Sequence, residues 1–139
     1  MLVTGGPAMK LEATRILDKL GHGSFVFNKA VFPDPEAEIR EFHDLHFKVV
    51  LHVVNPPENL YGRVSDAGPA AALPGDAANY WQQHVPLIKI GVDGWWPDEG
   101  DVLPVASRLV RNRMYWDGGR MTSPDKRPFA LHRNCYAGI

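Results

Sequence analysis

The sequence predicts an α/β fold in which parallel strands alternate with helices. A continuous run of apolar and β-branched residues at 48–54 is typical of a parallel strand that is buried on both faces. A second short apolar run follows at 92–96, and segments with helical spacing lie before and after both runs. Because a repeated helix–strand unit favours right-handed crossovers, the strands are expected to run in parallel.

The first predicted elements lie before residue 48. Residues 9–20 place apolar side chains at helical spacing, and residues 21–34 have the composition of a loop with a short extended piece. Residues 35–46 predict a further helix, because Asp34 is a favourable N-cap, a proline follows it, and two glutamates lie in the first turn. The expected buried face of this helix consists of Ile39, Phe42 and Leu45.

The middle of the chain continues the alternation. After the strand at 48–54, residues 58–75 are rich in Gly, Ala and Pro and predict a long loop. Asp76 is expected to cap a helix over 77–90, which Pro86 should kink.

The last third of the chain supplies another strand, helix and strand. The strand at 92–96 is followed by a turn and then by an amphipathic helix over 102–116. Residues 127–139 predict a final strand that runs into a loop. The helix is expected to bury Val105, Leu109 and Met114 and to expose Arg108, Arg111 and Arg113.

Charge and composition exclude several classes of function. A formal net charge of −1 over 139 residues gives no basic field, so neither nucleic acid nor an anionic membrane surface is an expected partner. No window approaches the ~20 apolar residues of a membrane span, and the N-terminus lacks the pattern of a secretory signal, so we expect a cytoplasmic protein. The sequence contains no glycine-rich phosphate-binding motif, so no nucleotide cofactor is predicted.

Histidine and cysteine do not predict a metal centre. His43 and His46 are three positions apart on a predicted helix, a spacing that metals accept, but no third ligand is evident and surface histidines are the expected interpretation. The single cysteine, Cys135, rules out an internal disulfide, and we expect a buried structural thiol rather than a nucleophile. No metal and no cofactor is therefore predicted.

Polar residues follow each of the three predicted strands. They lie at 52–55, 98–101 and 132–133. Because the carboxyl ends of parallel strands meet at one edge of the sheet, we expect these residues to converge there.

The middle group combines carboxylates with tryptophans. Trp95 and Trp96 precede Asp98, and an aromatic ring offers a flat apolar face to a pyranose, while a carboxylate can attack or stabilise an oxocarbenium-like centre. In the alternative interpretation these acidic residues are structural, and Asp101 caps the helix that follows.

The stretch GVDGWWPDEGD at 91–101 resembles the nucleophile region of glycoside hydrolase family 31. The family pattern is an aromatic-rich strand that ends in Trp, one further residue and Asp, which Trp96, Pro97 and Asp98 match; Glu-Gly-Asp replaces the usual Met-Asn-Glu after them. FPDPEAEIREFHDLHFKVVLHVVNP is similar to a helix and the third barrel strand of the family, and FALHRNCYAG resembles its arginine-bearing strand.

This resemblance implies a retaining mechanism on α-glycosidic bonds. Asp98 would be the nucleophile, Arg133 would bind sugar hydroxyls and the nucleophile's own carboxylate, and Trp95 or Trp96 would line the first sugar subsite. His52 and Asp101 are further candidates for binding the α-glycoside substrate. For His52, a packed core histidine is the alternative.

The resemblance also implies that the chain forms a partial (β/α)8 TIM barrel. A whole barrel takes roughly 250 residues, and the family's acid/base aspartate would lie beyond the last residue of this chain. We expect an incomplete catalytic domain at 22–139, a poorly matching segment at 1–21, and a second copy or another partner over the open barrel edge. The predicted function is α-glycoside hydrolysis, and the alternative is a non-catalytic barrel remnant that binds sugar weakly.

Overall fold

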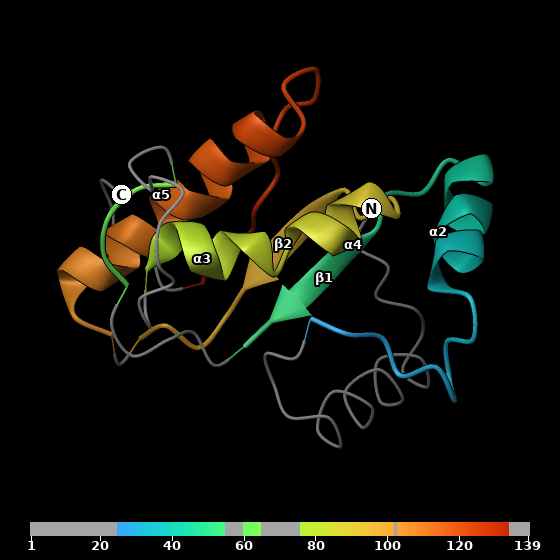
Figure 1. Cartoon of the computed structure of the whole chain (residues 1–139), viewed down its shortest axis with the longest axis horizontal. Helices are drawn as coiled ribbons and strands as arrows, with labels where there is room; N and C mark the ends of the chain where they lie inside the picture. Colours follow the sequence, from blue (N-terminus) through green and yellow to red (C-terminus); the bar gives the residue numbers. More distant parts are fainter. Residues whose placement is uncertain (1–24, 55–59, 65–75, 102, 134–139) are drawn as a thin grey trace.

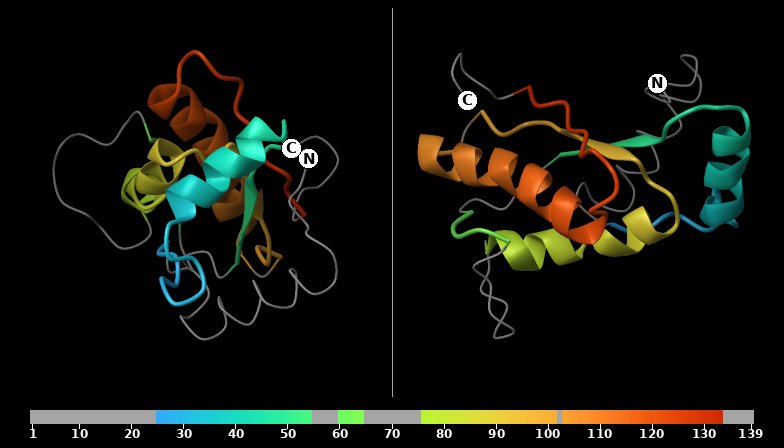
Figure 2. Two further views of the ribbon diagram at one scale, coloured as in Figure 1. Left: turned by 90° about the vertical axis from the view of Figure 1, so that its right-hand side faces the viewer. Right: turned by 90° about the horizontal axis from the view of Figure 1, so that it is seen from above.

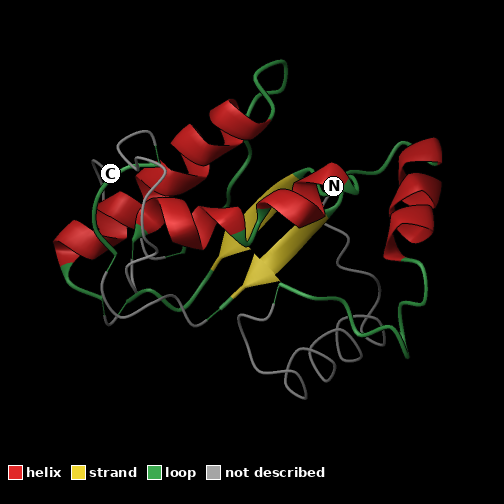
Figure 3. Ribbon diagram, viewed as in Figure 1, coloured by secondary structure: helices red, strands yellow, loops and turns green. Residues whose placement is uncertain are grey.

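The computed structural model describes residues 25–54, 60–64, 76–101 and 103–133. The elements in chain order are α2 (Pro35–Asp44), β1 (Val50–Val53), α3 (Ala77–Gln82), α4 (Val85–Lys89), β2 (Gly94–Pro97) and α5 (Val105–Thr122) (Figures 1 and 3). This alternation confirms the predicted α/β class. The helix predicted at 9–20, most of the loop at 58–75, and Cys135 lie outside the described residues.

The sheet is open, and its strands are parallel. β1 and β2 pair in a register that sets His52 opposite Trp96. The third predicted strand is present as a single parallel bridge between Trp95 and Ala130, at which the Leu131 N–H donates to the Trp95 carbonyl at 2.9 Å. The described residues therefore show an open sheet with β2 in the middle, and no closed barrel.

Helices α3, α4 and α5 all lie on one face of this sheet (Figures 1 and 2). The chain passes from α3 to α4 through a turn at 83–84, just before Pro86, so the predicted interruption of this helix is confirmed. Asp76 caps α3 as predicted, with its Oδ1 accepting from the Ala78 N–H at 2.8 Å. The N-terminus of a helix presents unpaired N–H groups, and this carboxylate satisfies them.

A cluster of buried aromatic side chains joins the helices to the sheet. The indole of Trp81 stacks on the His84 ring with 5.0 Å between ring centroids, and Trp95 meets the same histidine edge-on at 4.6 Å. Helix α5 approaches Trp81 closely at Gly118, where an added Cβ would lie 2.3 Å from the indole ring. Only glycine allows this approach, so Gly118 sets how deeply α5 packs.

One carboxylate helps to attach helix α2 to the rest of the domain. Asp34 caps the helix as predicted, through a hydrogen bond from the Ala37 N–H at 3.0 Å. Asp93, just before β2, accepts from His43 Nε2 at 2.7 Å, from Lys48 Nζ at 3.0 Å and from the Val49 N–H at 3.0 Å. This carboxylate therefore ties α2 and the start of β1 to β2.

The buried face of α5 differs from the predicted one. Val105 and Leu109 are exposed, whereas Arg111, predicted to be solvated, is fully buried. The helix turns its small residues and its arginine inward because Gly118 and Trp81 bring the helix close to α3. The buried positions are Ser107, Arg111, Met114, Tyr115 and Gly118.

Two smaller predictions about burial are also wrong. The first residues of β1 are half-buried rather than buried on both faces, since the described helices α3, α4 and α5 all cover the same face of the sheet. Leu45 is exposed just beyond the end of α2, although Ile39 and Phe42 pack inward as expected. None of the described helices is long and apolar enough to cross a lipid bilayer.

Candidate active site

Polar groups from three segments meet at the carboxyl end of the sheet. Asp98 follows β2, and this residue is only 8% exposed. His52 Nε2, from β1, donates to Asp98 Oδ2 at 3.0 Å. Arg133, from the third segment, forms an ion pair with Asp98, with 2.6 Å between Nε and Oδ1, and donates through Nη2 to Asp101 Oδ2 at 2.9 Å. The predicted convergence of the three segments is therefore observed.

Backbone hydrogen bonds around Asp98 orient its carboxylate. The Asp98 N–H donates to the Val53 carbonyl at 2.8 Å, which continues the ladder one residue past β2. Glu99 then adopts a positive φ of 53° and turns its own N–H onto Asp98 Oδ1 at 2.9 Å. The left-handed region is uncommon for a residue with a Cβ, so the turn directs an otherwise unpaired donor at the carboxylate.

These donors keep Asp98 ionised. Burial by itself raises the pKa of Asp98, but the hydrogen bonds from the Glu99 N–H and from His52, together with the charge of Arg133, outweigh it and hold the pKa below its ordinary value. The carboxylate is therefore a negatively charged acceptor at neutral pH, which is the state that a nucleophile requires.

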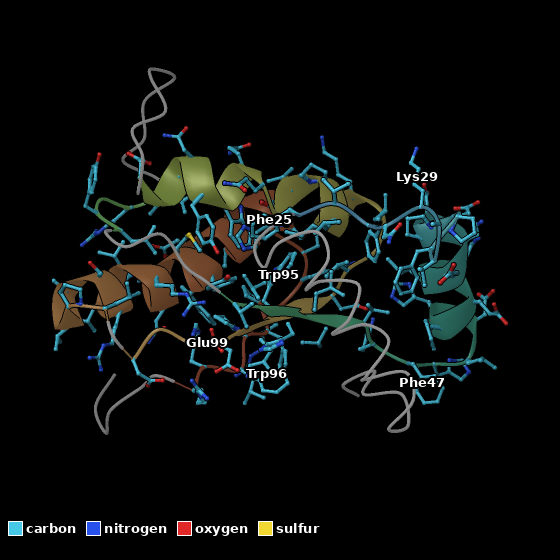
Figure 4. All side chains as sticks on the ribbon, turned by 90° about the horizontal axis from the view of Figure 1, so that it is seen from below. Phe25, Lys29, Phe47, Trp95, Trp96 and Glu99 are labelled. Carbon is cyan, nitrogen blue, oxygen red and sulfur yellow. The ribbon has the colours of Figure 1, made fainter. Side chains whose placement is uncertain are left out.

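The two tryptophans point to opposite faces of the sheet. Trp95 is 4% exposed and packs among the aromatic residues under the helices, whereas Trp96 lies on the other side with Glu99 nearby (Figure 4). The Trp96 ring lies beside that of His52, with 4.3 Å between centroids and 33° between planes. Trp95, which was predicted as a possible sugar-binding residue, lies in the core, and Trp96 is the tryptophan beside His52 of the site.

Asp101 does not cap the following helix, because the N-cap position of α5 is Pro104. Its carbonyl oxygen accepts from Arg108 Nη2 at 2.7 Å, and its exposed carboxylate reaches the site through Arg133. Arg133 therefore bridges Asp98 and Asp101.

Sequence reasoning missed two contributors at this end of the sheet. The first is the Glu99 N–H, whose only sequence signal was the glycine at position 100, typical of a tight turn. The second is Arg111, buried behind the strand ends, where its Nη2 lies 3.4 Å from the Val53 carbonyl. In the described part of the chain its Nε and Nη1 have no hydrogen-bond partner.

Among residues 25–54, 60–64, 76–101 and 103–133, no group of three potential metal ligands is present. His43, one of the two histidines with metal-compatible spacing, is bound to Asp93 instead. Neither a protein-family model nor a curated protein matches the sequence.

Proposed function

We propose that this chain carries the nucleophile side of the catalytic site of a retaining α-glycoside hydrolase, as part of a (β/α)8 barrel. The observation that carries the proposal is the buried Asp98 carboxylate, which is ion-paired with Arg133 and hydrogen-bonded to His52, whose ring lies beside that of Trp96. A carboxylate in this state next to an aromatic surface suits attack on an anomeric carbon.

The placement of the site supports the barrel part of the proposal. In a barrel the helices lie outside, the opposite face of the sheet lies inside, and the active site is at the carboxyl ends of the strands. Here helices α3, α4 and α5 lie on one face, and the site lies at the strand ends, with Trp96 on the opposite face from Trp95. Phe129 and Leu131 are 53% and 48% exposed on the third segment, as interior side chains of an incomplete barrel would be.

In the proposed reaction Asp98 forms a bond to the anomeric carbon while the glycosidic C–O bond breaks. The leaving oxygen takes the bonding pair and a proton from a carboxylic acid, which the described residues do not supply. Arg133 stabilises Asp98 before attack, and its fixed donor fork is suited to neighbouring sugar hydroxyls. Water then hydrolyses the glycosyl ester with the second carboxyl group acting as base.

A second candidate function is sugar binding without turnover. It is favoured by the observation that, within the described residues, the carboxylate of Asp101 reaches Asp98 only through Arg133. The Asp101 carboxylate is exposed and ion-paired, a setting that does not suit a proton donor.

The two candidates are separated by covalent labelling. The chain is incubated with an aziridine analogue of an α-glucoside, which can take its ring-nitrogen proton from water and so requires only the nucleophile from the protein. Intact-mass spectrometry and peptide mapping should find one adduct, on Asp98, in the wild-type chain. The Asp98→Asn variant should carry no adduct. Reversible binding without an adduct would favour the second candidate, and neither binding nor labelling would contradict both.

A further inference from the structure

The two carboxylate oxygens of Asp98 differ in how many groups contact them. Oδ1 accepts from the Glu99 N–H at 2.9 Å and forms an ion pair with Arg133, whose Nε lies 2.6 Å away. Oδ2 accepts from His52 Nε2 at 3.0 Å. An ionised carboxylate offers about two lone-pair positions on each oxygen. Within the described residues, Oδ1 is therefore contacted by two groups and Oδ2 by one, which leaves Oδ2 the more open oxygen.

His52 is well placed to hold this arrangement. Its backbone lies in β1, in register with Trp96, and the Trp96 ring lies against its imidazole at 4.3 Å. Its side chain is 34% exposed, so one edge of the ring faces outward while the other is directed at Asp98. Because an ionised carboxylate can only accept, Nε2 must be the protonated nitrogen of His52.

We infer that His52 is a positioning residue, whose Nε2–H fixes the rotation of the Asp98 carboxylate and leaves Oδ2 as the attacking oxygen. This inference rests on the proposed function and deepens it. It also changes the role predicted for His52, which acts through Asp98 and not by contact with the sugar. Without the histidine donor, the carboxylate keeps only the Glu99 N–H and the Arg133 ion pair, both at Oδ1, and can rotate about its Cβ–Cγ bond.

The test compares substitutions at position 52 in the same labelling reaction. His52→Ala removes the donor, and we expect labelling of Asp98 to slow by roughly 10- to 100-fold, the scale of effect that misplacing a reacting group produces. His52→Gln places an amide N–H at nearly the position of the imidazole Nε2–H, so it should restore most of the rate. His46→Asn is the matched control, because His46 is exposed and has a positive φ of 62°, which Asn tolerates. Asp98 of this variant should be labelled at the wild-type rate.

A second measurement does not depend on any reaction. The ionisation of Asp98 is followed by carbon NMR of its carboxyl group in the unlabelled protein. The hydrogen bond from His52 is one of the contacts that lower the pKa of Asp98, so the pKa should rise in His52→Ala and return toward the wild-type position in His52→Gln. A merely structural effect of the alanine would not be reversed by glutamine in both measurements.

The outcomes separate the inference from the function on which it rests. Slow labelling in His52→Ala with rescue by His52→Gln supports both. Wild-type labelling that is unchanged in His52→Ala keeps the proposed function and overturns the role of His52. Absence of labelling in the wild-type chain overturns the assignment of Oδ2 as the attacking oxygen together with the proposed function. In that case the pKa of Asp98 still tests the contact between His52 and Asp98. A pKa that rises in His52→Ala and recovers in His52→Gln supports this contact. An unchanged pKa overturns it.

Discussion

The buried imidazole of His84 should make the protein sensitive to mild acid. The side chain is 0% exposed and lies between Trp81 and Trp95, its Nδ1–H donates to the Tyr80 carbonyl at 3.0 Å, and its Nε2 accepts from the Tyr115 hydroxyl at 3.0 Å. The pKa of His84 is lowered to about 3, chiefly by burial and in part by the charge of Arg111, against the raising effect of the backbone hydrogen bonds. The native protein therefore keeps His84 neutral.

The sign and size of the effect follow from the two protonation states. Above the ordinary pKa of about 6.5 the histidine is neutral in both the folded and the unfolded chain, and its contribution does not depend on pH. As the pH falls below 6.5, only the unfolded chain binds the proton, so the free energy of unfolding decreases. With a folded pKa of about 3, this loss is about 2 kcal/mol at pH 5 and about 4 kcal/mol at pH 3.

The assay is urea unfolding followed by tryptophan fluorescence at pH 7, 6 and 5. His84→Gln keeps a donor and an acceptor but cannot titrate, so it should be less stable than the wild type at pH 7 and lose less stability on acidification. The difference between the two proteins should shrink by about 2 kcal/mol between pH 7 and 5. His132, whose pKa burial lowers to about 4, is present in both proteins and cancels from this difference. A constant difference across this range would refute the reasoning.

Three further predictions test the packing and the site. Gly118→Ala would place a methyl group 2.3 Å from the Trp81 indole, so we expect a loss of about 1–3 kcal/mol in urea unfolding, and an unchanged midpoint would show that α5 can move away. Asp93→Asn can no longer satisfy all three donors that bind Asp93, and should cost about 1–3 kcal/mol in the same assay; equal stability would mean that the contact to α2 contributes nothing. Arg133→Met removes a charge that lowers the pKa of Asp98, so carbon NMR should show that pKa rising, and less so in Arg133→Lys; an unshifted titration would contradict the ion pair.

Local sequence patterns were sufficient to predict where two helices begin and at which edge of the sheet the site lies. Asp34 and Asp76 cap helices because their short carboxylates reach backbone N–H groups a few residues ahead, an interaction that requires no distant partner. The meeting of His52, Asp98 and Arg133 follows from parallel strands, whose carboxyl ends share one edge. The chemistry assigned to these residues stays a proposal.

The α/β alternation, the parallel strands and the edge at which the polar residues gather all follow from the pattern of residues along the chain. Which side chains face that edge depends on tertiary contacts. Trp95 and Trp96 are indistinguishable as neighbours in a strand, and the side taken by the helices sends one into the core and the other to Asp98. The burial of Arg111 likewise depends on the rotation of α5, which the contact of Gly118 with Trp81 sets. Such choices depend on contacts between residues far apart in the chain, and no local pattern of residues contains them.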